Sequence, residues 1–463
     1  MTDVAPSKNA VYDQMELLAT KAASGATLPA APYTNQIFLH TPTGRKILYQ
    51  YDGTSWTPIY AYGLTTLYVS TTGTDDQEHG TADGTDAFLT VTYALSQVPG
   101  LCAGSVVINV GAGTFSEDVV VRGKLCSGAD SININGTLTS LLSATMDSGV
   151  QGSTTANGSV TDAGAFTATV STTVDATSAA GQKVLNVAST TGFAVGDVVL
   201  VNSDGARQEL ITVASIQTGV SLTARANLRY EHTAAQADAV AQCQYAGKQI
   251  KVGSDIRVID YHTASVVYIC GAFSAAISGA YTIYDYGTIL GASTTTASLT
   301  TTPPLMPVYC YNIKFNGVIY SYSFTILTLM NCTVEKDSAA TSYSSLGAYY
   351  CYFNNGYLQI QNAKGAVYSC LFKMVTATYG VLVTRQAYAD IRNGNVISGA
   401  KTGVSAIDYG YVSLGTAYNY FRNCITYGIS ATNLSKIVAS TYPQYTNCAT
   451  DSYADAATFS IIT

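Results

Sequence analysis

The sequence predicts an all-β protein whose body is a parallel β-helix solenoid, with a short N-terminal helix, a small N-terminal β module and an inserted small β-domain. Three segments share one plan, with glycines about 23 and 25 residues apart: 379–383, 402–406 and 427–431. A second strand-like run follows each glycine by about eight residues: 388–391, 411–414 and 436–439. Short strands that repeat at about this period indicate stacked coils. The segments lack a helical apolar stripe, so a β-solenoid is the simplest fold.

A cysteine series extends this repeat upstream. Its members lie in similar contexts about 22, 19 and 19 residues apart: Cys310, Cys332, Cys351 and Cys370. Later coils carry residues that we expect at equivalent positions: Asn395, Asn423-Cys424 and Asn447-Cys448. We expect these small side chains to face the interior, one strand spacing of roughly 4.8 Å apart. Stacked coils rarely supply disulfide geometry, so the thiols are expected to be free.

Composition argues against several classes of function. The net charge of −7 disfavours a nucleic-acid partner, because phosphate binding needs a basic surface. Ten cysteines without a framework spacing indicate folding in a reducing compartment. The first residues lack the apolar segment of a signal peptide, and no apolar run is long enough to predict membrane insertion.

Motifs for cofactor or metal chemistry are also missing from the sequence. No phosphate-binding loop, zinc-ligand spacing or Ser/His/Asp arrangement appears, so we expect neither a cofactor nor a metal. The four histidines are scattered, and we expect them at ordinary surface or turn positions: His40, His79, His232 and His262.

Two small units are expected before the solenoid. Residues 1–32 are predicted to form a helix and linker for attachment and trimerisation. The helix carries one apolar stripe that we expect to meet copies of itself or a docking partner: Val11, Met15, Leu18 and Ala22. Residues 33–63 are predicted to form a small β module with a hairpin turn at Asp52-Gly53, and Trp56 is expected to anchor its core.

Four further segments complete the predicted organisation. Residues 64–160 are the expected entry to the β-helix, with a helix over residues 87–98 that caps the open sheet edge. Residues 165–245 alternate between short strands and Gly-containing turns, which predicts a separate β-domain inserted in a solenoid loop. Residues 247–450 form the predicted body of the β-helix, and residues 451–463 form a C-terminal tail.

Several segments together resemble bacteriophage tail proteins and cover about half of the chain. Residues 5–13 (APSKNAVYD) look like a motif common in phage tail fibres. Residues 68–70, 84–90 and 107–117 resemble the opening of pectate-lyase-like right-handed β-helices, which include phage tailspikes. Residues 188–199 are similar to a small β module found within phage tail and baseplate proteins.

The resemblance to phage tail fibres and tailspikes implies right-handed coils, a homotrimer and a location in the virion tail. It implies an N-terminus that docks on other tail or baseplate proteins and a body that binds a host-surface glycan or protein. We expect non-enzymatic attachment to the host cell. Two alternatives stay open, which are a polysaccharide depolymerase acting as a glycosidase or lyase, and a purely structural tail or baseplate component.

The carboxylates of the predicted body offer one weak catalytic pair. Glu335 and Asp337 are two residues apart, so on one strand they would share a face about 6.5–7 Å apart. Glycosidases use carboxyl pairs at about this separation. A solvated turn would explain the two residues equally well, so the catalytic residues stay unknown.

Tyrosines supply the candidate residues for receptor or glycan binding. Asp285 lies between Tyr284 and Tyr286, and a carboxylate flanked by aromatic rings suits a sugar. Two other pairs have the two-residue spacing that places both rings on one face of a strand: Tyr320 with Tyr322, and Tyr409 with Tyr411. A trimer interface, or stacking of tyrosines along the coils, is the alternative for each pair.

Overall fold

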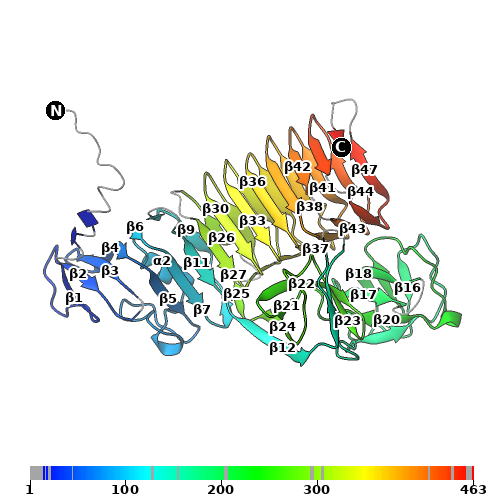
Figure 1. The fold of residues 1–463 in the computed structure, drawn as a ribbon, viewed down its shortest axis with the longest axis horizontal. Helices are drawn as coiled ribbons and strands as arrows, with labels where there is room; N and C mark the ends of the chain where they lie inside the picture. Colours follow the sequence, from blue (N-terminus) through cyan, green and yellow to red (C-terminus); the bar gives the residue numbers. More distant parts are fainter. Residues whose placement is uncertain are drawn as a thin grey trace. The chain divides into compact units, whose positions relative to one another are not determined.

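The computed structural model confirms an all-β protein containing a right-handed parallel β-solenoid. It describes residues 14–15, 17–18, 22–43, 45–126, 130–153, 156–202, 207–291, 297–303, 307–415, 418–439, 443–454 and 461–462. The chain divides into two compact units, the first with residues 1–139, 286–330 and 341–345, the second with residues 140–285, 331–340 and 346–463. In each unit the coils form three parallel sheets, here called the first, second and third coil sheets (Figure 1).

The coils of the first unit contribute strands to all three sheets. The first coil sheet contains β5 (Thr65–Val69), β7 (Val106–Val110), β11 (Ile132–Asn135), β27 (Val308–Tyr311) and β30 (Ile326–Met330). The second contains β8 (Gly113–Phe115), β25 (Thr288–Leu290) and β28 (Ile313–Phe315), and the third β9 (Val119–Val121), β26 (Ala297–Thr301) and β29 (Val318–Ser321). One buried column runs through the first coil sheet in register: Leu67, Ile108, Ile134, Cys310 and Leu329.

The chain leaves the solenoid after β11 and returns to it at β25. The exit and the return are joined, because the Thr137 N–H donates to Thr288 Oγ1 at 2.8 Å and the Gly287 N–H donates to the Thr137 carbonyl at 2.8 Å. The excursion between these two points is longer than the predicted domain of residues 165–245. The prediction that coils continue to residue 160 and resume at residue 247 is therefore wrong.

The N-terminal β module is joined to the first coils by a shared sheet. Its strands are β2 (Ile37–His40), β3 (Ile47–Tyr51) and β4 (Trp56–Tyr62), and β1 (Ala23–Gly25) pairs with β2. The sheet continues in parallel from β4 to β6 (Leu101–Ala103) and β10 (Leu125–Cys126), so it extends beyond residues 33–63. Trp56 is 7% exposed and lies against Phe38 and Tyr51, as the sequence predicted.

Most of the predicted N-terminal helix lies outside the described residues. Of its apolar stripe, Met15, Leu18 and Ala22 pack against the buried Leu48 and Tyr60 of the β module. These three stripe residues therefore contact the module of their own chain and stay partly exposed, and the expectation that the stripe meets another copy or a docking partner stays a prediction.

A short helix covers the first coil, but it begins four residues later and ends two residues earlier than the predicted range of residues 87–98. Helix α2 (Val91–Ser96) follows the 3-10 turn η1 (Gly84–Asp86) and packs on β5, β7 and β9. The residues expected on its inner side are buried: Phe88, Val91, Leu95 and Val98. Two acceptors hold its N-terminus, because Thr90 Oγ1 accepts from the Tyr93 N–H at 3.0 Å and Glu117 accepts from the N–H groups of Val91 and Thr92 at 2.8 Å.

The coils of the second unit confirm the repeats found in the sequence. The first coil sheet contains β33 (Ser345–Tyr349), β36 (Lys364–Tyr368), β39 (Tyr388–Arg392), β42 (Tyr411–Leu414), β45 (Lys436–Ala439) and β48 (Ile461–Ile462). The second contains β31 (Thr333–Val334), β34 (Tyr352–Asn354), β37 (Leu371–Lys373), β40 (Val396–Ser398), β43 (Tyr420–Arg422) and β46 (Gln444–Thr446). The third contains β32 (Ser338–Thr341), β35 (Leu358–Gln361), β38 (Tyr379–Thr384), β41 (Thr402–Ile407), β44 (Tyr427–Ala431) and β47 (Thr450–Ala454).

Coil pairing also includes the segment expected to be a tail. Strand β47 pairs in parallel with β44, and β48 pairs in parallel with β45. The predicted boundary at residue 450 is therefore wrong, because strands beyond it join the coil sheets.

The buried cysteine series changes to asparagine along the coils. Cys332, Cys351 and Cys370 each precede a strand of the second coil sheet and are fully buried, as predicted. The next two coils place Asn395 and Asn419 there, and Asn395 Nδ2 donates to Asn419 Oδ1 at 2.9 Å. Asn423-Cys424 and Asn447-Cys448 instead follow strands β43 and β46, so their predicted place in this column is wrong. Cys310 is also elsewhere, in the first coil sheet.

The excursion from the coils folds into two antiparallel sheets of the second unit. One contains β12 (Leu138–Thr145), β13 (Ser148–Val150), β14 (Ser159–Thr161), β21 (Gln249–Val252), β22 (Asp255–His262), β23 (Val266–Ile269) and β24 (Ala280–Tyr286). The other contains β15 (Ser171–Thr173), β16 (Val184–Asn186), β17 (Val198–Val201), β18 (Glu209–Gln217), β19 (Ser221–Ala224) and β20 (Ala239–Gln242). Each sheet has its own apolar core, and we call the two together the insert. The predicted domain of residues 165–245 corresponds to the second sheet.

The insert packs on the outer face of the second coil sheet. Val258 and Cys270 of the insert share a buried cluster with Tyr352, Leu371 and Val396 of the coils. Beside this cluster, the Arg422 guanidinium donates to both oxygens of Asp260, at 3.0 and 2.6 Å. Charges in such a buried place are stable only when paired.

One close backbone approach lies at this contact. Gly271 of the insert has a φ of +78°, and a Cβ atom added to it would lie 2.2 Å from Ser369 Oγ of the coils. A larger residue would therefore strain the backbone and push the two layers apart.

We predict that Arg422→Ala loosens the insert from the coils. Asp260 is 5% exposed, so losing its partner leaves a buried charge and costs about 3–5 kcal/mol of the free energy of unfolding. Thermal unfolding and limited proteolysis of the insert would measure the loss. The double variant Arg422→Met/Asp260→Leu removes both charges and should lose less than the single variant. An unchanged unfolding curve for Arg422→Ala would contradict this role of the ion pair.

Candidate functional site

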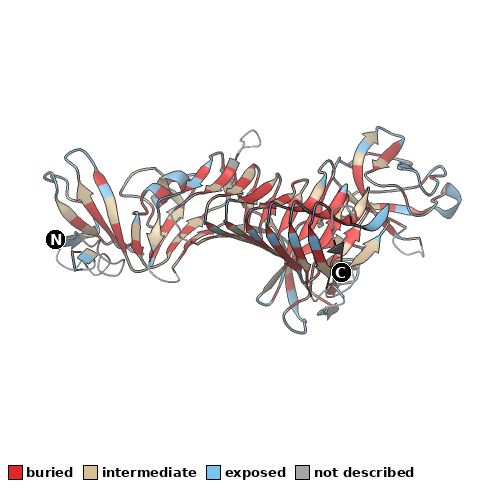
Figure 2. Ribbon diagram, turned by 90° about the horizontal axis from the view of Figure 1, so that it is seen from above, coloured by how far each residue is buried: buried red, intermediate tan, exposed pale blue. Residues whose placement is uncertain are grey.

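The open side of the first coil sheet in the second unit carries aromatic and charged side chains. Along β36, β39, β42 and β45, alternate residues point inward, and the inward column of Val367, Ile391 and Leu414 is fully buried. Figure 2 shows the buried residues of the coils in red. The alternate residues point outward, and we call seven of them the aromatic face: Lys364, Tyr368, Tyr388, Asp390, Arg392, Tyr411 and Lys436.

Register places two tyrosines of this face on top of each other, between two lysines. Lys364 pairs with Tyr388, Tyr388 with Tyr411, and Tyr411 with Lys436 in successive strands. The rings of Tyr388 and Tyr411 are stacked, with centroids 5.4 Å apart and planes at 14°. The two tyrosines are 37% and 36% exposed, so the stack presents apolar surface and hydroxyl groups to solvent.

A polar cluster centred on Asp390 lies on the same face. Its carboxylate accepts from Tyr368 Oη at 2.8 Å and from Arg392 Nε at 2.6 Å. Burial and the Asp390 charge raise the pKa of Tyr368 to about 12, so this hydroxyl remains a donor at neutral pH. Among the seven residues of the aromatic face, Asp390 is the one carboxylate, and the others offer rings, ammonium and guanidinium groups.

The sequence pointed to one of the stacked tyrosines and missed the other. Tyr409 and Tyr411 were expected to share a strand face, but Tyr409 lies in a left-handed corner before β42, with a φ of 67°. That expectation is wrong, and Tyr409 stands 58% exposed outside the sheet. The partner of Tyr411 is Tyr388, and both lie eight residues after a repeat glycine. This equal offset was the signal that could have identified the pair.

The predicted pair Tyr320 and Tyr322 does share a face, in the first unit. The two rings are stacked with centroids 5.3 Å apart. Phe324 and Tyr343, which the sequence analysis did not select, also stack at 5.6 Å and are 60% and 73% exposed. Phe324 and Tyr343 therefore form a second exposed aromatic group.

Tyr284, Asp285 and Tyr286 do not form an open sugar platform. Lys248 Nζ donates a hydrogen bond to the Asp285 carboxylate at 2.6 Å. Tyr286, at the end of β24, is 8% exposed. Tyr284 is partly buried on the same strand. A buried ring cannot offer its face to a ligand, so the geometric basis of this candidate is wrong.

Glu335 and Asp337 lie in the corner between β31 and β32, and the premise that they share a strand is wrong. Glu335 accepts from Asn354 Nδ2 at 2.7 Å. It also lies near Lys373, whose pKa burial lowers to about 8 against the opposing effect of the Glu335 charge. Burial raises the pKa of Asp337, which accepts from the Tyr357 N–H at 3.2 Å. Both carboxylates thus have structural partners.

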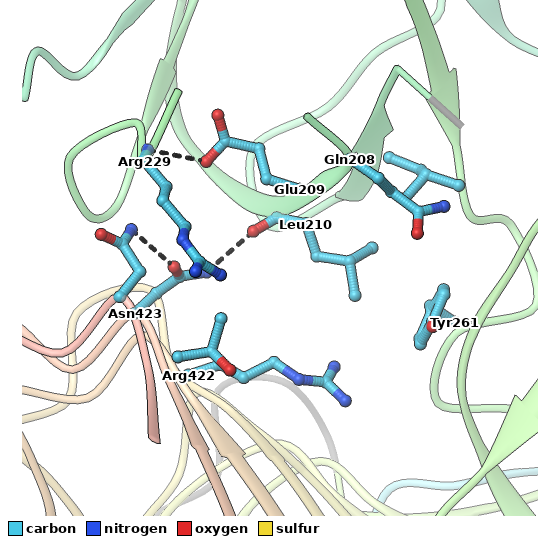
Figure 3. Close-up of a pocket in the computed structure, with 10 residues that line it drawn as sticks. Gln208, Glu209, Leu210, Arg229, Tyr261, Arg422 and Asn423 are labelled. Carbon is cyan, nitrogen blue, oxygen red and sulfur yellow. Dashed lines mark hydrogen bonds between the residues drawn. The ribbon is translucent and has the colours of Figure 1, made fainter. Parts of the chain in front are cut away.

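A cavity of about 160 Å³ lies where the insert meets the coils (Figure 3). We call it the seam cavity. The insert contributes Leu200, Gln208, Glu209, Leu210, Arg229 and Tyr261, and the coils contribute Arg422, Asn423, Thr446 and Asn447. Asn423 Nδ2 donates to the Leu210 carbonyl at 2.8 Å and Asn447 Nδ2 donates to Asn423 Oδ1 at 3.0 Å, which fixes these amides in the wall.

Behind the seam cavity, a buried histidine lies between two carboxylates. His232 is fully buried, with Nε2 2.7 Å from Glu209 Oε1 and Nδ1 2.8 Å from Asp238 Oδ2. Arg207 Nη2 donates a hydrogen bond to Asp238 Oδ1 at 3.2 Å. Burial lowers the pKa of His232, but the two carboxylates outweigh it and the net change is upward.

The other histidines also depart from the surface positions expected for them. His40 and His262 are 1% and 2% exposed, and only His79 is partly exposed, where it pairs with Asp76 at 2.6 Å. Burial and the charge of Arg45 lower the pKa of His40 to about 4. A scattered histidine gives no local sequence signal for such a partner, because the partners come from distant strands.

Comparison with solved structures finds distant likenesses to phage tailspikes. No family model and no curated protein matches this chain. Three solved structures that resemble it are the tailspike protein gp49 of Pseudomonas phage LKA1, the tailspike gp61 of Pseudomonas phage phi297, and the gp54 tailspike of Acinetobacter baumannii bacteriophage AP22 in complex with A. baumannii capsular saccharide.

The similarity to these tailspikes is distant. Sequence identities are 11%, 11% and 7%, with TM-scores of 0.25, 0.19 and 0.16. The matches cover 72%, 79% and 75% of this chain and 54%, 66% and 64% of the tailspike chains, so this chain spans about half to two thirds of their length. At these TM-scores the likeness by itself assigns no function.

Within the described ranges of the chain, no three side chains of His, Cys, Asp or Glu gather as metal ligands would. No helix in the described part of the chain is long and apolar enough to cross a membrane.

We predict that the insert loses stability as the pH rises above about 6.5. The folded pKa of His232 is raised above the ordinary 6.5, so its stabilising charge is fully present below that pH and is lost as the pH passes the folded value. His232→Gln leaves Glu209 and Asp238 without a cation between them and should cost about 3 kcal/mol at pH 6. Thermal unfolding from pH 6 to pH 9 measures both effects. A steeper decline for the variant than for the wild type would contradict the assignment.

Proposed function

We propose that the protein is a phage tail receptor-binding protein, located in the virion tail, whose β-helix attaches to a glycan on the host surface without cleaving it. The observation that carries the proposal is the Tyr388–Tyr411 stack on an open sheet, between Lys364 and Lys436. Sugars present apolar ring faces rimmed by hydroxyl groups, and tyrosines match both features.

The polar cluster supports a sugar ligand over a purely apolar partner. Tyr368, Asp390 and Arg392 supply donors and acceptors in a fixed arrangement next to the stack. Preorganised side chains lose little conformational freedom on binding, which favours specific recognition. Attachment is favoured over cleavage because the aromatic face has one carboxylate, held by two donors.

We predict that Tyr388→Ala and Tyr411→Ala each weaken glycan binding about tenfold, which corresponds to about 1.4 kcal/mol. Each variant removes one ring of the stack and half of its apolar surface. Biolayer interferometry against a panel of bacterial surface polysaccharides, together with binding of labelled protein to whole cells, measures the loss. Tyr33→Ala is the matched control, because Tyr33 is 69% exposed and lies outside the aromatic face.

The same assay separates the alternatives. Failure of the wild-type protein to bind any cell or polysaccharide would favour a structural tail or baseplate component. Release of reducing ends or unsaturated products from a bound polysaccharide would establish a depolymerase. Glu335→Gln and Asp337→Asn would then test the two carboxylates first selected for catalysis.

The proposal includes a homotrimer that docks on other tail or baseplate proteins through its N-terminus. The resemblance of residues 5–13 to a tail-fibre motif supports this part. We predict a mass near three times 48.5 kDa in light scattering. A monomer at micromolar concentration would contradict the trimer and leave the glycan assay unaffected.

A further inference from the structure

The seam cavity has an unusual balance of charge for a protein with a net charge of −7. Its wall includes two arginines and one carboxylate, Glu209. That carboxylate is already engaged, by His232 at 2.7 Å and by the N–H of Arg229 at 2.9 Å. The charge of Arg422 is likewise matched by Asp260. These pairs leave Arg229 as the uncompensated charge of the wall.

The guanidinium of Arg229 has no ion pair among the described residues. Its one described side-chain contact is with the ring of Tyr230, 5.0 Å from the centroid. Arg229 is exposed, and Figure 3 shows its side chain running beside the cavity toward the coils. A planar guanidinium with free donors binds a carboxylate through two parallel hydrogen bonds.

Neighbouring cations add to the positive potential along the same contact. Lys183 lines an adjoining cavity of about 220 Å³ that shares Asn447 with the seam cavity. Arg225 also lies at this contact, where its Nε donates to the Gly399 carbonyl of the coils at 3.1 Å. Positive charges that line a concave surface raise the local concentration of anionic ligands.

The rest of the seam cavity is suited to a sugar ring. Tyr261 and Leu200 supply apolar surface, and Gln208 and Thr446 supply hydroxyl or amide groups in the wall. Tyr261 is held in place by stacking on Tyr268 at 4.5 Å and by Arg422, 5.5 Å from its ring centroid. The cavity volume of about 160 Å³ is small, which favours a single sugar ring as the ligand.

We propose that the seam cavity binds one carboxylate-bearing sugar residue, with Arg229 holding the carboxylate. The choice of a sugar rests on the proposed function, and the anionic group follows from the cavity itself. The cavity lies on the second coil sheet and the aromatic face on the first, so the two sites can be tested separately.

The test uses the full-length protein and glucuronate as the probe, by isothermal titration calorimetry and saturation-transfer NMR. Wild type is expected to bind glucuronate at least tenfold more tightly than glucose, and added salt should weaken the binding. Arg229→Gln should weaken glucuronate binding at least tenfold. The affinity of Arg229→Lys should lie between those of the wild type and Arg229→Gln, because lysine keeps the positive charge but cannot make the bidentate hydrogen bonds of a guanidinium. Arg122→Gln, an exposed charge loss in the first unit, is the control and should bind as wild type does.

Each outcome decides between the proposals. Equal binding of glucuronate and glucose, or full binding by a folded Arg229→Gln, would overturn the seam site. Equal or tighter binding of inorganic phosphate would show a general anion site and overturn the sugar assignment. Tyr388→Ala should keep glucuronate binding, so loss of cell binding in that variant alone would leave the seam site standing. Thermal unfolding checks that Arg229→Gln folds, as expected for an exposed side chain without a described hydrogen bond.

Discussion

In-register stacking of parallel strands is the constraint on which the described features depend. A strand alternates its side chains between two faces, so a slip of one residue would exchange the interior with the surface. The pairing of Tyr388 with Tyr411 places two rings in contact on the outside and, one residue along, Ala389 beside Val412 on the inside. The same register places Asn395 beside Asn419, where the buried amides satisfy each other and nearby carbonyls.

The coils of the second unit differ in what covers each sheet. The insert packs on the second coil sheet, where Leu371 and Val396 are apolar and Arg422 meets Asp260. The outward residues of the first coil sheet include tyrosines, lysines, Asp390 and Arg392. Outward residues of the two sheets therefore differ in chemistry as well as in exposure. The open sheet is the natural place to look for a ligand, and the contact under the insert adds a concave site.

Sequence reasoning succeeded where a local pattern decides the structure. The glycine-centred repeats after residue 379 became strands β38, β41 and β44, because a regular spacing of short strands has one compact solution. Helix α2 and the burial of Trp56 were likewise predictable from patterns of a few residues. Boundaries failed where both antiparallel and parallel pairing suit the same alternating strands, as in β21 to β24.

The candidate sites show more clearly how little a local sequence pattern predicts about contacts between distant residues. Tyr409 and Tyr411 share a spacing with Tyr320 and Tyr322, yet a left-handed corner at Tyr409 turns its ring away from the strand. His232 meets Glu209 and Asp238, and Arg422 meets Asp260 across 162 residues of chain.

By itself, the sequence determined the β-helix, the buried cysteines and the existence of an insert, since these follow from periodicity and from the burial of apolar side chains. Only the tertiary structure decided which sheet stays open, which tyrosines stack and which charges pair. Those outcomes depend on contacts between residues far apart in the chain, which the spacing of residues in a short segment does not predict.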